Sequence, residues 1–125
     1  MFESINLEHT FYSIQLSIAE NQHITIGKLG TFTFQKGTYI YVGSAKRNIR
    51  QRIERYKRVN KKNHWHFDYL RPFGVITRII TYDASFKECD LAENIRKQMN
   101  GTLPFNGFGS SDCKCFSHLI FVEDK

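Results

Sequence analysis

The 125 residues of the chain are 41% hydrophobic and 24% charged, ordinary proportions for one globular domain, so disorder and a coiled coil are both disfavoured. The formal charge of +6 favours polyanionic partners. We expect neither a membrane span nor a secretory signal, because no apolar run approaches about 20 residues and no basic leader precedes one. Three cysteines, Cys89, Cys113 and Cys115, are an odd count with two of them one residue apart, a poor disulfide framework that favours a reducing cytoplasm.

The first forty-odd residues predict β-strands. Residues 9–18 alternate apolar and polar side chains, and residues 24–26 and 32–34 continue this alternation on either side of a glycine-bracketed reversal. Residues 38–42 are rich in β-branched and aromatic side chains. We interpret this region as an antiparallel meander.

A helix is expected over residues 47–59, because Ile49, Ile53 and Tyr56 recur at helical spacing. Arg52 falls on the same apolar face, which should pack on the sheet. A basic side chain in such a place is costly unless it meets an anion. A solvated helix face therefore does not explain Arg52.

Four further elements complete the predicted fold: a short helix that ends before Pro72, a strand, a third helix and a final strand. Ser85 is the expected N-cap of the third helix, with Glu88 as its capping-box partner. This order predicts one compact α/β (α+β) domain over residues 1–125, in which a small, mainly antiparallel sheet is flanked by three helices. The four elements cover residues 64–70, 75–82, 86–99 and 115–122.

Basic residues are concentrated in residues 46–62, which hold nine Lys and Arg against one acid, Glu54. Such a segment attracts phosphates, although a solvated helix face is the alternative. An anionic membrane is disfavoured because the segment lacks a large apolar face beside the charges. The residues expected to contact nucleic acid are Lys46, Arg47, Arg50, Arg55, Lys57, Arg58, Lys61 and Lys62, together with His66.

Short motifs resemble the GIY-YIG nuclease superfamily. The run Tyr41–Val42–Gly43–Ser44–Ala45–Lys46 precedes a helix with Arg52 and Tyr56, and Thr10–Phe11–Tyr12 is the nearest match to the first half of the superfamily's name. Residues 13–40 separate these two triplets where the superfamily has a short hairpin, which implies an extra β-hairpin.

Four longer segments resemble one poorly characterised branch of this superfamily, and they occur in the same order. They are Gly-x-Tyr-x-Tyr-Val-Gly-Ser-Ala at 37–45, Trp-His-x-Asp-Tyr-Leu at 65–70, Glu-Cys-x-Leu-Ala at 88–92 and Phe-Gly-Ser-Ser-Asp-Cys-x-Cys-x-Ser-His-Leu at 108–119.

The resemblance implies phosphodiester hydrolysis with one Mg²⁺ or Mn²⁺ ion that is held by a single carboxylate. Arg52 would stabilise the charge that develops on the scissile phosphate. Tyr41 would help to deprotonate the attacking water, while Tyr12 and Tyr56 would position water and phosphate. Because a tyrosine titrates near about 10, Tyr41 needs a neighbouring cation, supplied by Arg52, Lys46 or the metal.

The metal-binding carboxylate is expected at Glu88, with Glu93 as the alternative. Glu88 is followed by Leu91 and Ala92, which resembles the superfamily's Glu-x-x-Leu-Ile, whereas Glu93 matches if the helix is shifted by five residues. We expect Tyr41, Arg52 and Glu88 to converge on one open patch that Lys46 and Tyr56 rim.

A second metal site is indicated by Cys113-x-Cys115-x-x-His118, which with Cys89 would supply four zinc ligands. Buried thiols that pack in the core are the alternative. Nearby, His66 and Asp68 are expected to form a hydrogen-bonded pair beside the cleft.

These features lead to two hypotheses. The first is a divalent-metal-dependent endonuclease that acts on DNA in repair or processing. The alternative is a catalytically silent nucleic-acid-binding module, stabilised by zinc, that uses the same basic helix. RNA stays open as a partner, and so does the oligomeric state.

Overall fold

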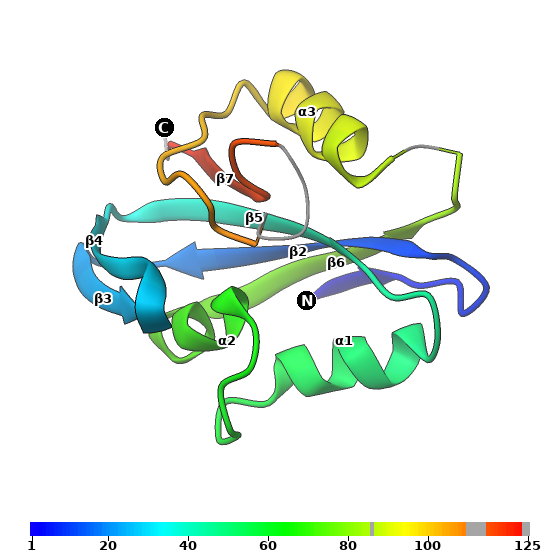
Figure 1. Cartoon of the computed structure of the whole chain (residues 1–125), viewed down its shortest axis with the longest axis horizontal. Helices are drawn as coiled ribbons and strands as arrows, with labels where there is room; N and C mark the ends of the chain where they lie inside the picture. Colours follow the sequence, from blue (N-terminus) through cyan, green and yellow to red (C-terminus); the bar gives the residue numbers. More distant parts are fainter. Residues whose placement is uncertain (86, 110–114, 124–125) are drawn as a thin grey trace.

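A five-stranded sheet runs through the centre of the computed structural model, which describes residues 1–85, 87–109 and 115–123 (Figure 1). Its strand order is β1-β6-β2-β5-β7, in which β1 pairs with β6 in parallel and the other neighbours are antiparallel. The expected small and mainly antiparallel sheet is thereby confirmed. The strands are β1 (Phe2–Ser4), β2 (Phe11–Ile18), β5 (Gly37–Ser44), β6 (Val75–Tyr82) and β7 (Leu119–Val122).

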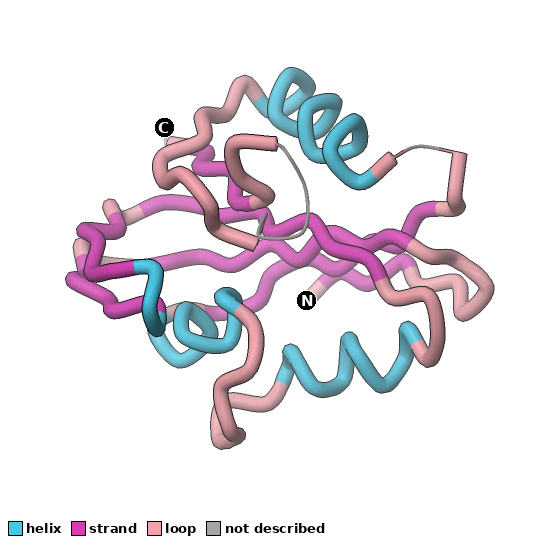
Figure 2. Tube along the Cα trace, viewed as in Figure 1, coloured by secondary structure: helices cyan, strands magenta, loops and turns pink. Residues whose placement is uncertain are grey.

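A separate hairpin is made by β3 (Gln22–Ile26) and β4 (Gly30–Phe34), joined by the 3-10 turn η1 (Gly27–Leu29) (Figure 2). This is the extra hairpin that the long spacing implied. Because the hairpin leaves the central sheet, β2 pairs directly with β5 along its whole length. The predicted simple meander is therefore wrong in its pairing, although each of its strands is present.

Three α-helices flank the sheet, as expected: α1 (Ile49–Lys57), α2 (His66–Leu70) and α3 (Glu88–Met99). The first two cover one face and α3 covers the other (Figure 1). Pro72 does not end the helical path after α2, because it sits in the 3-10 turn η2 (Arg71–Phe73). In the described part of the chain, no helix has the length and apolarity needed to cross a bilayer.

The start of α3 differs from the prediction. Lys87 occupies the N-cap position without a side-chain hydrogen bond, so the expected cap at Ser85 and capping box at Glu88 are wrong. The physical reason is local: the backbone N–H of Ser85 donates instead to Asp83 Oδ1 at 3.0 Å, in a turn before the helix. The carboxylate of Glu88 is consequently not used in a cap.

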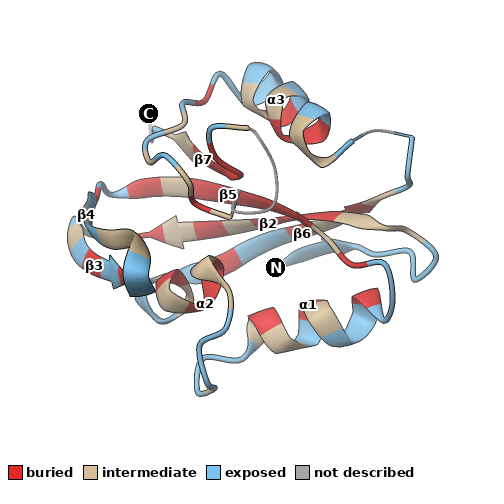
Figure 3. Ribbon diagram, in the orientation of Figure 1, coloured by how far each residue is buried: buried red, intermediate tan, exposed pale blue. Residues whose placement is uncertain are grey.

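Alternation along the strands divides the core between the two faces of the sheet (Figure 3). Tyr41 belongs to the cluster that includes Ile53 of α1 and Phe67 of α2, whereas the next residue, Val42, packs in the cluster that includes Leu91 of α3. Tyr12, Tyr39 and Tyr41 are thus directed to the α1 side of the sheet, whereas Tyr82 packs on the α3 side.

Candidate active site

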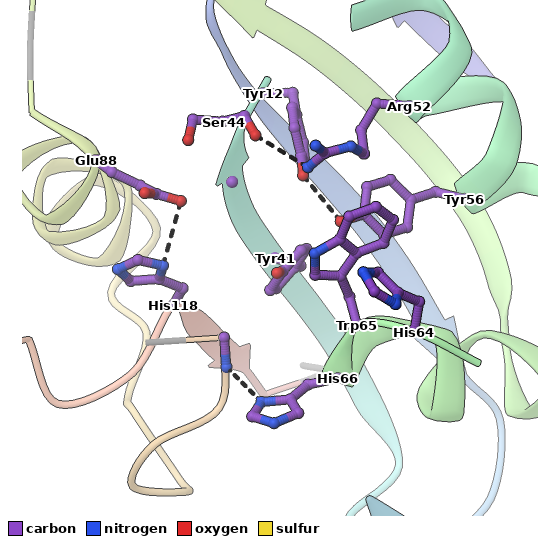
Figure 4. Close-up of a pocket in the computed structure, with 12 residues that line it drawn as sticks. Tyr12, Tyr41, Ser44, Arg52, Tyr56, His64, Trp65, His66, Glu88 and His118 are labelled. Atoms are coloured by element: carbon purple, nitrogen blue, oxygen red, sulfur yellow. Dashed lines mark hydrogen bonds and ion pairs between the residues drawn. The ribbon is translucent and has the colours of Figure 1, made fainter. Parts of the chain in front are cut away.

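A pocket of about 220 Å³ opens beside the C-terminal end of β5 (Figure 4). All five side chains that the sequence singled out for catalysis line it, so their expected convergence is confirmed. Lys46, which was expected at the rim, is not among the lining residues. Those residues are Tyr12, Tyr41, Gly43, Ser44, Arg52, Tyr56, His64, Trp65, His66, Glu88, Gly109 and His118.

Three buried tyrosines form the floor of the pocket. Tyr12 comes from β2, Tyr41 from β5 and Tyr56 from α1, and their ring centroids lie 5.6 to 6.5 Å apart. Tyr12 Oη donates a hydrogen bond to Tyr56 Oη at 2.9 Å. Gly43 allows this packing, because a Cβ there would lie 2.6 Å from Cζ of Tyr12.

The tyrosine hydroxyls keep their protons at neutral pH. Burial raises the pKa of Tyr12 and Tyr41 well above the ordinary value, and the neighbouring Tyr56 raises both further. The positive charge of Arg52 acts in the opposite direction but is outweighed. The hydroxyls therefore act first as hydrogen-bond donors, and Arg52 alone does not make Tyr41 a base.

Arg52 lies on the sheet-facing side of α1 and is half-buried. Its Nη1 donates to the carbonyl oxygen of Ser44 at 3.1 Å, and its guanidinium carbon lies 4.2 Å from the ring centroid of Trp65. Within residues 1–85, 87–109 and 115–123, no carboxylate forms an ion pair with Arg52. A half-buried cation held this way beside an open pocket suits an anionic ligand.

Glu88 and Arg52 lie on opposite sides of the tyrosine hydroxyls (Figure 4). Glu88 is the one carboxylate among the described lining residues, and its side chain is 29% exposed. Glu93 is not at the pocket, because it forms an ion pair with Arg96 one turn along α3. A single carboxylate that is open to water fits Mg²⁺ or Mn²⁺, which keep several water ligands.

His66 is held in one tautomer at the lower edge of the pocket. Its Nδ1 accepts a hydrogen bond from the backbone N–H of Gly109 at 2.8 Å, and burial lowers its pKa. The neutral ring therefore carries its proton on Nε2 and offers a donor.

The expected pair between His66 and Asp68 is wrong. Asp68 is fully buried and accepts from Arg55 Nη1 and from the backbone N–H groups of His64 and Trp65, all at 2.8 to 2.9 Å. Its place in the first turn of α2 directs the carboxylate to the N–H groups that precede the helix, and away from the pocket.

The predicted basic segment divides into two groups. Arg55 and Lys61 both form ion pairs with Asp68, and Lys57 forms ion pairs with Glu3 and Glu54. These three cations stabilise the fold. The exposed basic side chains of the segment are Lys46, Arg47, Arg50, Arg58 and Lys62.

Cys89 and Cys115 are joined by a disulfide, with their Cα atoms 6.0 Å apart. The prediction of a poor disulfide framework is wrong, because Cys115 pairs across 26 residues and not with its neighbour in sequence. The inference of a reducing compartment from cysteine spacing loses its basis. Cys113 lies outside the described residues.

The predicted gathering of the other ligands is confirmed: the ligand atoms of Cys89, Cys115 and His118 all lie within 4.8 Å of one another.

Sequence reasoning missed several lining residues, among them Trp65, Gly109 and His118 as a neighbour of Glu88. The available signal was the motif segments at 65–70 and 108–119, which contain all three.

The fold and the pocket together define an α+β domain with a tyrosine-rich, arginine-containing site that carries one carboxylate. A family model described as a domain of unknown function, DUF123, matches residues 11–125, and the chain belongs to this family. No curated protein and no solved structure matches the chain.

Proposed function

We propose that this domain is a divalent-metal-dependent endonuclease of the GIY-YIG type, which hydrolyses phosphodiester bonds in DNA during repair or processing. The observation that carries the proposal is Arg52, a half-buried cation without a carboxylate partner in the described part of the chain, opposite Glu88 across three tyrosine hydroxyls. The similarity of Tyr41–Lys46 and the helix after it to the GIY-YIG pattern supports the same function.

Each side chain has a separate role in this proposal. Arg52 donates to the phosphate oxygens on which negative charge grows during the reaction. Glu88 holds Mg²⁺ or Mn²⁺, which when bound neutralises phosphate charge and lowers the pKa of a coordinated water. Tyr12 and Tyr56 orient water and phosphate through their hydroxyls. His66 adds a donor from Nε2.

Tyr41 is protonated in the free protein, because burial raises its pKa. It accepts a proton from the attacking water only when more positive charge lies beside its hydroxyl than Arg52 provides. The raised pKa of Tyr41 also favours the second candidate function, a nucleic-acid-binding module without catalysis. In that case the pocket binds a phosphate but has no base.

A cleavage assay separates the two functions. Purified protein is incubated with labelled single-stranded, duplex, flapped and branched DNA over a range of Mg²⁺ and Mn²⁺ concentrations. Arg52→Ala should reduce cleavage about 100-fold or more, because it removes charge stabilisation made mainly in the transition state. Glu88→Gln should abolish metal-dependent cleavage and leave DNA affinity nearly unchanged.

Glu93→Gln is the matched control on the same helix, since its carboxylate binds Arg96 away from the pocket. It should cleave at the wild-type rate. If the wild-type protein binds DNA but cleaves none of the four substrates with either metal, the binding-module function stands in place of the nuclease. Cleavage that survives both Arg52→Ala and Glu88→Gln would remove the activity from this pocket.

A further inference from the structure

A second group of chemically reactive side chains adjoins the pocket, on the α3 side. Cys89 lies in the first turn of α3, and Cys115 and His118 precede β7. His118 is 1% exposed, and its Nε2 lies 2.8 Å from Cys115 Sγ and 3.6 Å from Cys89 Sγ. The two halves of the group come from segments 26 residues apart, so the fold itself assembles it.

The donor set is one that zinc prefers. Two thiolates and one imidazole nitrogen are common protein ligands of Zn²⁺, with a water or another donor in the fourth position. The ligand atoms of the three residues lie within 4.8 Å of one another, close enough for one metal ion to contact all of them once the thiols are reduced.

The other nitrogen of His118 supports this interpretation. Its Nδ1 lies 3.4 Å from Glu88 Oε1. A carboxylate beside the second nitrogen of a ligating histidine is a common arrangement in metal sites. Here Nδ1 lies beside the Glu88 carboxylate while Nε2 faces the two sulfur atoms.

We propose that Cys89, Cys115 and His118 form a zinc site. The site can bind Zn²⁺ when the disulfide between Cys89 and Cys115 is reduced, and it loses the metal when the disulfide re-forms. A dithiol reductant transfers two electrons and two protons to the disulfide, giving two thiols and the oxidised dithiol. Zn²⁺ then displaces the two thiol protons and binds both thiolates and His118 Nε2. Hydrogen peroxide reverses this: two thiolates, one peroxide and two protons give the disulfide, two waters and free Zn²⁺.

Zinc at this site also affects Glu88. Glu88 immediately precedes Cys89 and contacts His118, so a metal that immobilises both neighbours holds the Glu88 carboxylate at the edge of the pocket. The thiol state thereby regulates the pocket. This regulatory step rests on the proposed function, whereas zinc binding does not.

The zinc site is tested on the 125-residue chain with Cys113→Ser, which leaves only the two cysteines of the disulfide. The protein is prepared oxidised or reduced with a phosphine, offered Zn²⁺ alone, desalted, and assayed for zinc and for free thiols. We expect about one zinc per chain in the reduced form and almost none in the oxidised form. Co²⁺ in place of Zn²⁺ should give a thiolate-to-metal absorption band.

His118→Ala and Glu88→Gln distinguish the roles within the site. Glu88→Gln should weaken zinc binding about tenfold but keep the cobalt band. His118→Ala, which removes a ligand, should weaken zinc binding at least as much. Circular dichroism checks that each variant folds. Reduced Cys113→Ser protein that takes up no zinc, or a cobalt complex without the thiolate band, would overturn the proposal even if no other variant folds.

Cleavage assays on the same samples keep the two proposals apart. Faster cleavage by the reduced, zinc-loaded protein than by the oxidised protein supports the regulatory step. Equal cleavage by both forms removes regulation and leaves the zinc site. Zinc binding without any cleavage contradicts the nuclease function alone.

Discussion

Gly43 controls how closely Tyr12 can approach the end of β5. The two residues face each other in the β2–β5 pair, and the Tyr12 ring lies across the glycine. Since the hydroxyl of Tyr12 also donates to Tyr56, a shift of this ring alters two of the three hydroxyls on the pocket floor.

We therefore expect Gly43→Ala to lower the cleavage rate about 10- to 100-fold, because small displacements of positioning groups cost rate steeply. The rate is measured under saturating DNA, and thermal unfolding of the same variant checks that it is folded. A folded Gly43→Ala protein with the wild-type rate would show that the position of Tyr12 does not matter for turnover.

At the scale of residues, the sequence predicted well those side chains whose neighbours are set by local periodicity. Arg52 could be placed on the sheet-facing side of α1 because Ile49 and Tyr56 flank it at helical spacing. The hydrogen bond between His66 and Gly109 could not be predicted, because it joins positions 43 residues apart. The motif around Glu88 favoured it over Glu93, but which of the two carboxylates lines the pocket depends on the rotation of α3 about its axis.

Among the elements, α1 and the segment around it hold two kinds of cation that look alike in sequence. Lys57 is engaged with Glu3 of β1, a strand of three exposed residues that has no pattern by which it could be predicted. Lys46 and Arg47, by contrast, are exposed and lie two and three residues after the pocket residue Ser44. They are two exposed cations close in sequence to the pocket and, with Arg50 and Lys62, remain available for phosphate.

The double variant Lys46→Ala/Arg47→Ala should weaken DNA binding and make it less dependent on salt. Each phosphate contact contributes roughly 0.9 to the slope of log affinity against log salt, so the loss of two contacts should reduce that slope by about two. Fluorescence anisotropy between low and moderate salt measures it. Lys57→Ala, which removes one charge that is held in ion pairs with Glu3 and Glu54, should leave the slope nearly unchanged.

A different order of salt slopes among these variants would show that DNA binds to another part of the surface. If Lys57→Ala reduced the slope as much as the double variant, the ion pairs with Glu3 and Glu54 would not hold Lys57 away from phosphate. If neither protein changed the slope, DNA would not bind across this part of the molecule.

For the molecule as a whole, the pocket depends on both layers of the fold. Arg52 and Tyr56 come from α1 on one face of the sheet, and Glu88 comes from α3 on the other (Figures 1 and 4). Sequence patterns predicted both helices and the sheet between them. They could not predict that the layers meet at one end of β5, because that depends on strand order and on β2 pairing directly with β5.

Asp68 joins α2 to α1 through its ion pair with Arg55, and we expect its ionisation to determine the acid stability of the domain. Burial acts to raise its pKa, but the N–H groups of Trp65 and His64 and the cations Arg55 and Lys61 outweigh burial and hold the pKa below its ordinary value. A carboxyl whose pKa is lowered on folding contributes stability above its unfolded value of about 3.9. That contribution is lost as the pH falls through the lower, folded value.

Asp68→Asn should therefore cost about 3–5 kcal/mol at pH 7, because it leaves buried donors without their anion. The difference in unfolding free energy from the wild type should shrink as the pH falls below about 4, where the carboxyl of the unfolded chain becomes protonated, and should be smallest below the lower pKa of the folded protein. Urea unfolding from pH 7 to pH 2 measures this difference. Glu20→Gln, an exposed turn position, should stay within about 0.5 kcal/mol of the wild type throughout. A deficit in Asp68→Asn that is constant down to pH 2 would mean that side-chain shape, and not charge, makes Asp68 necessary.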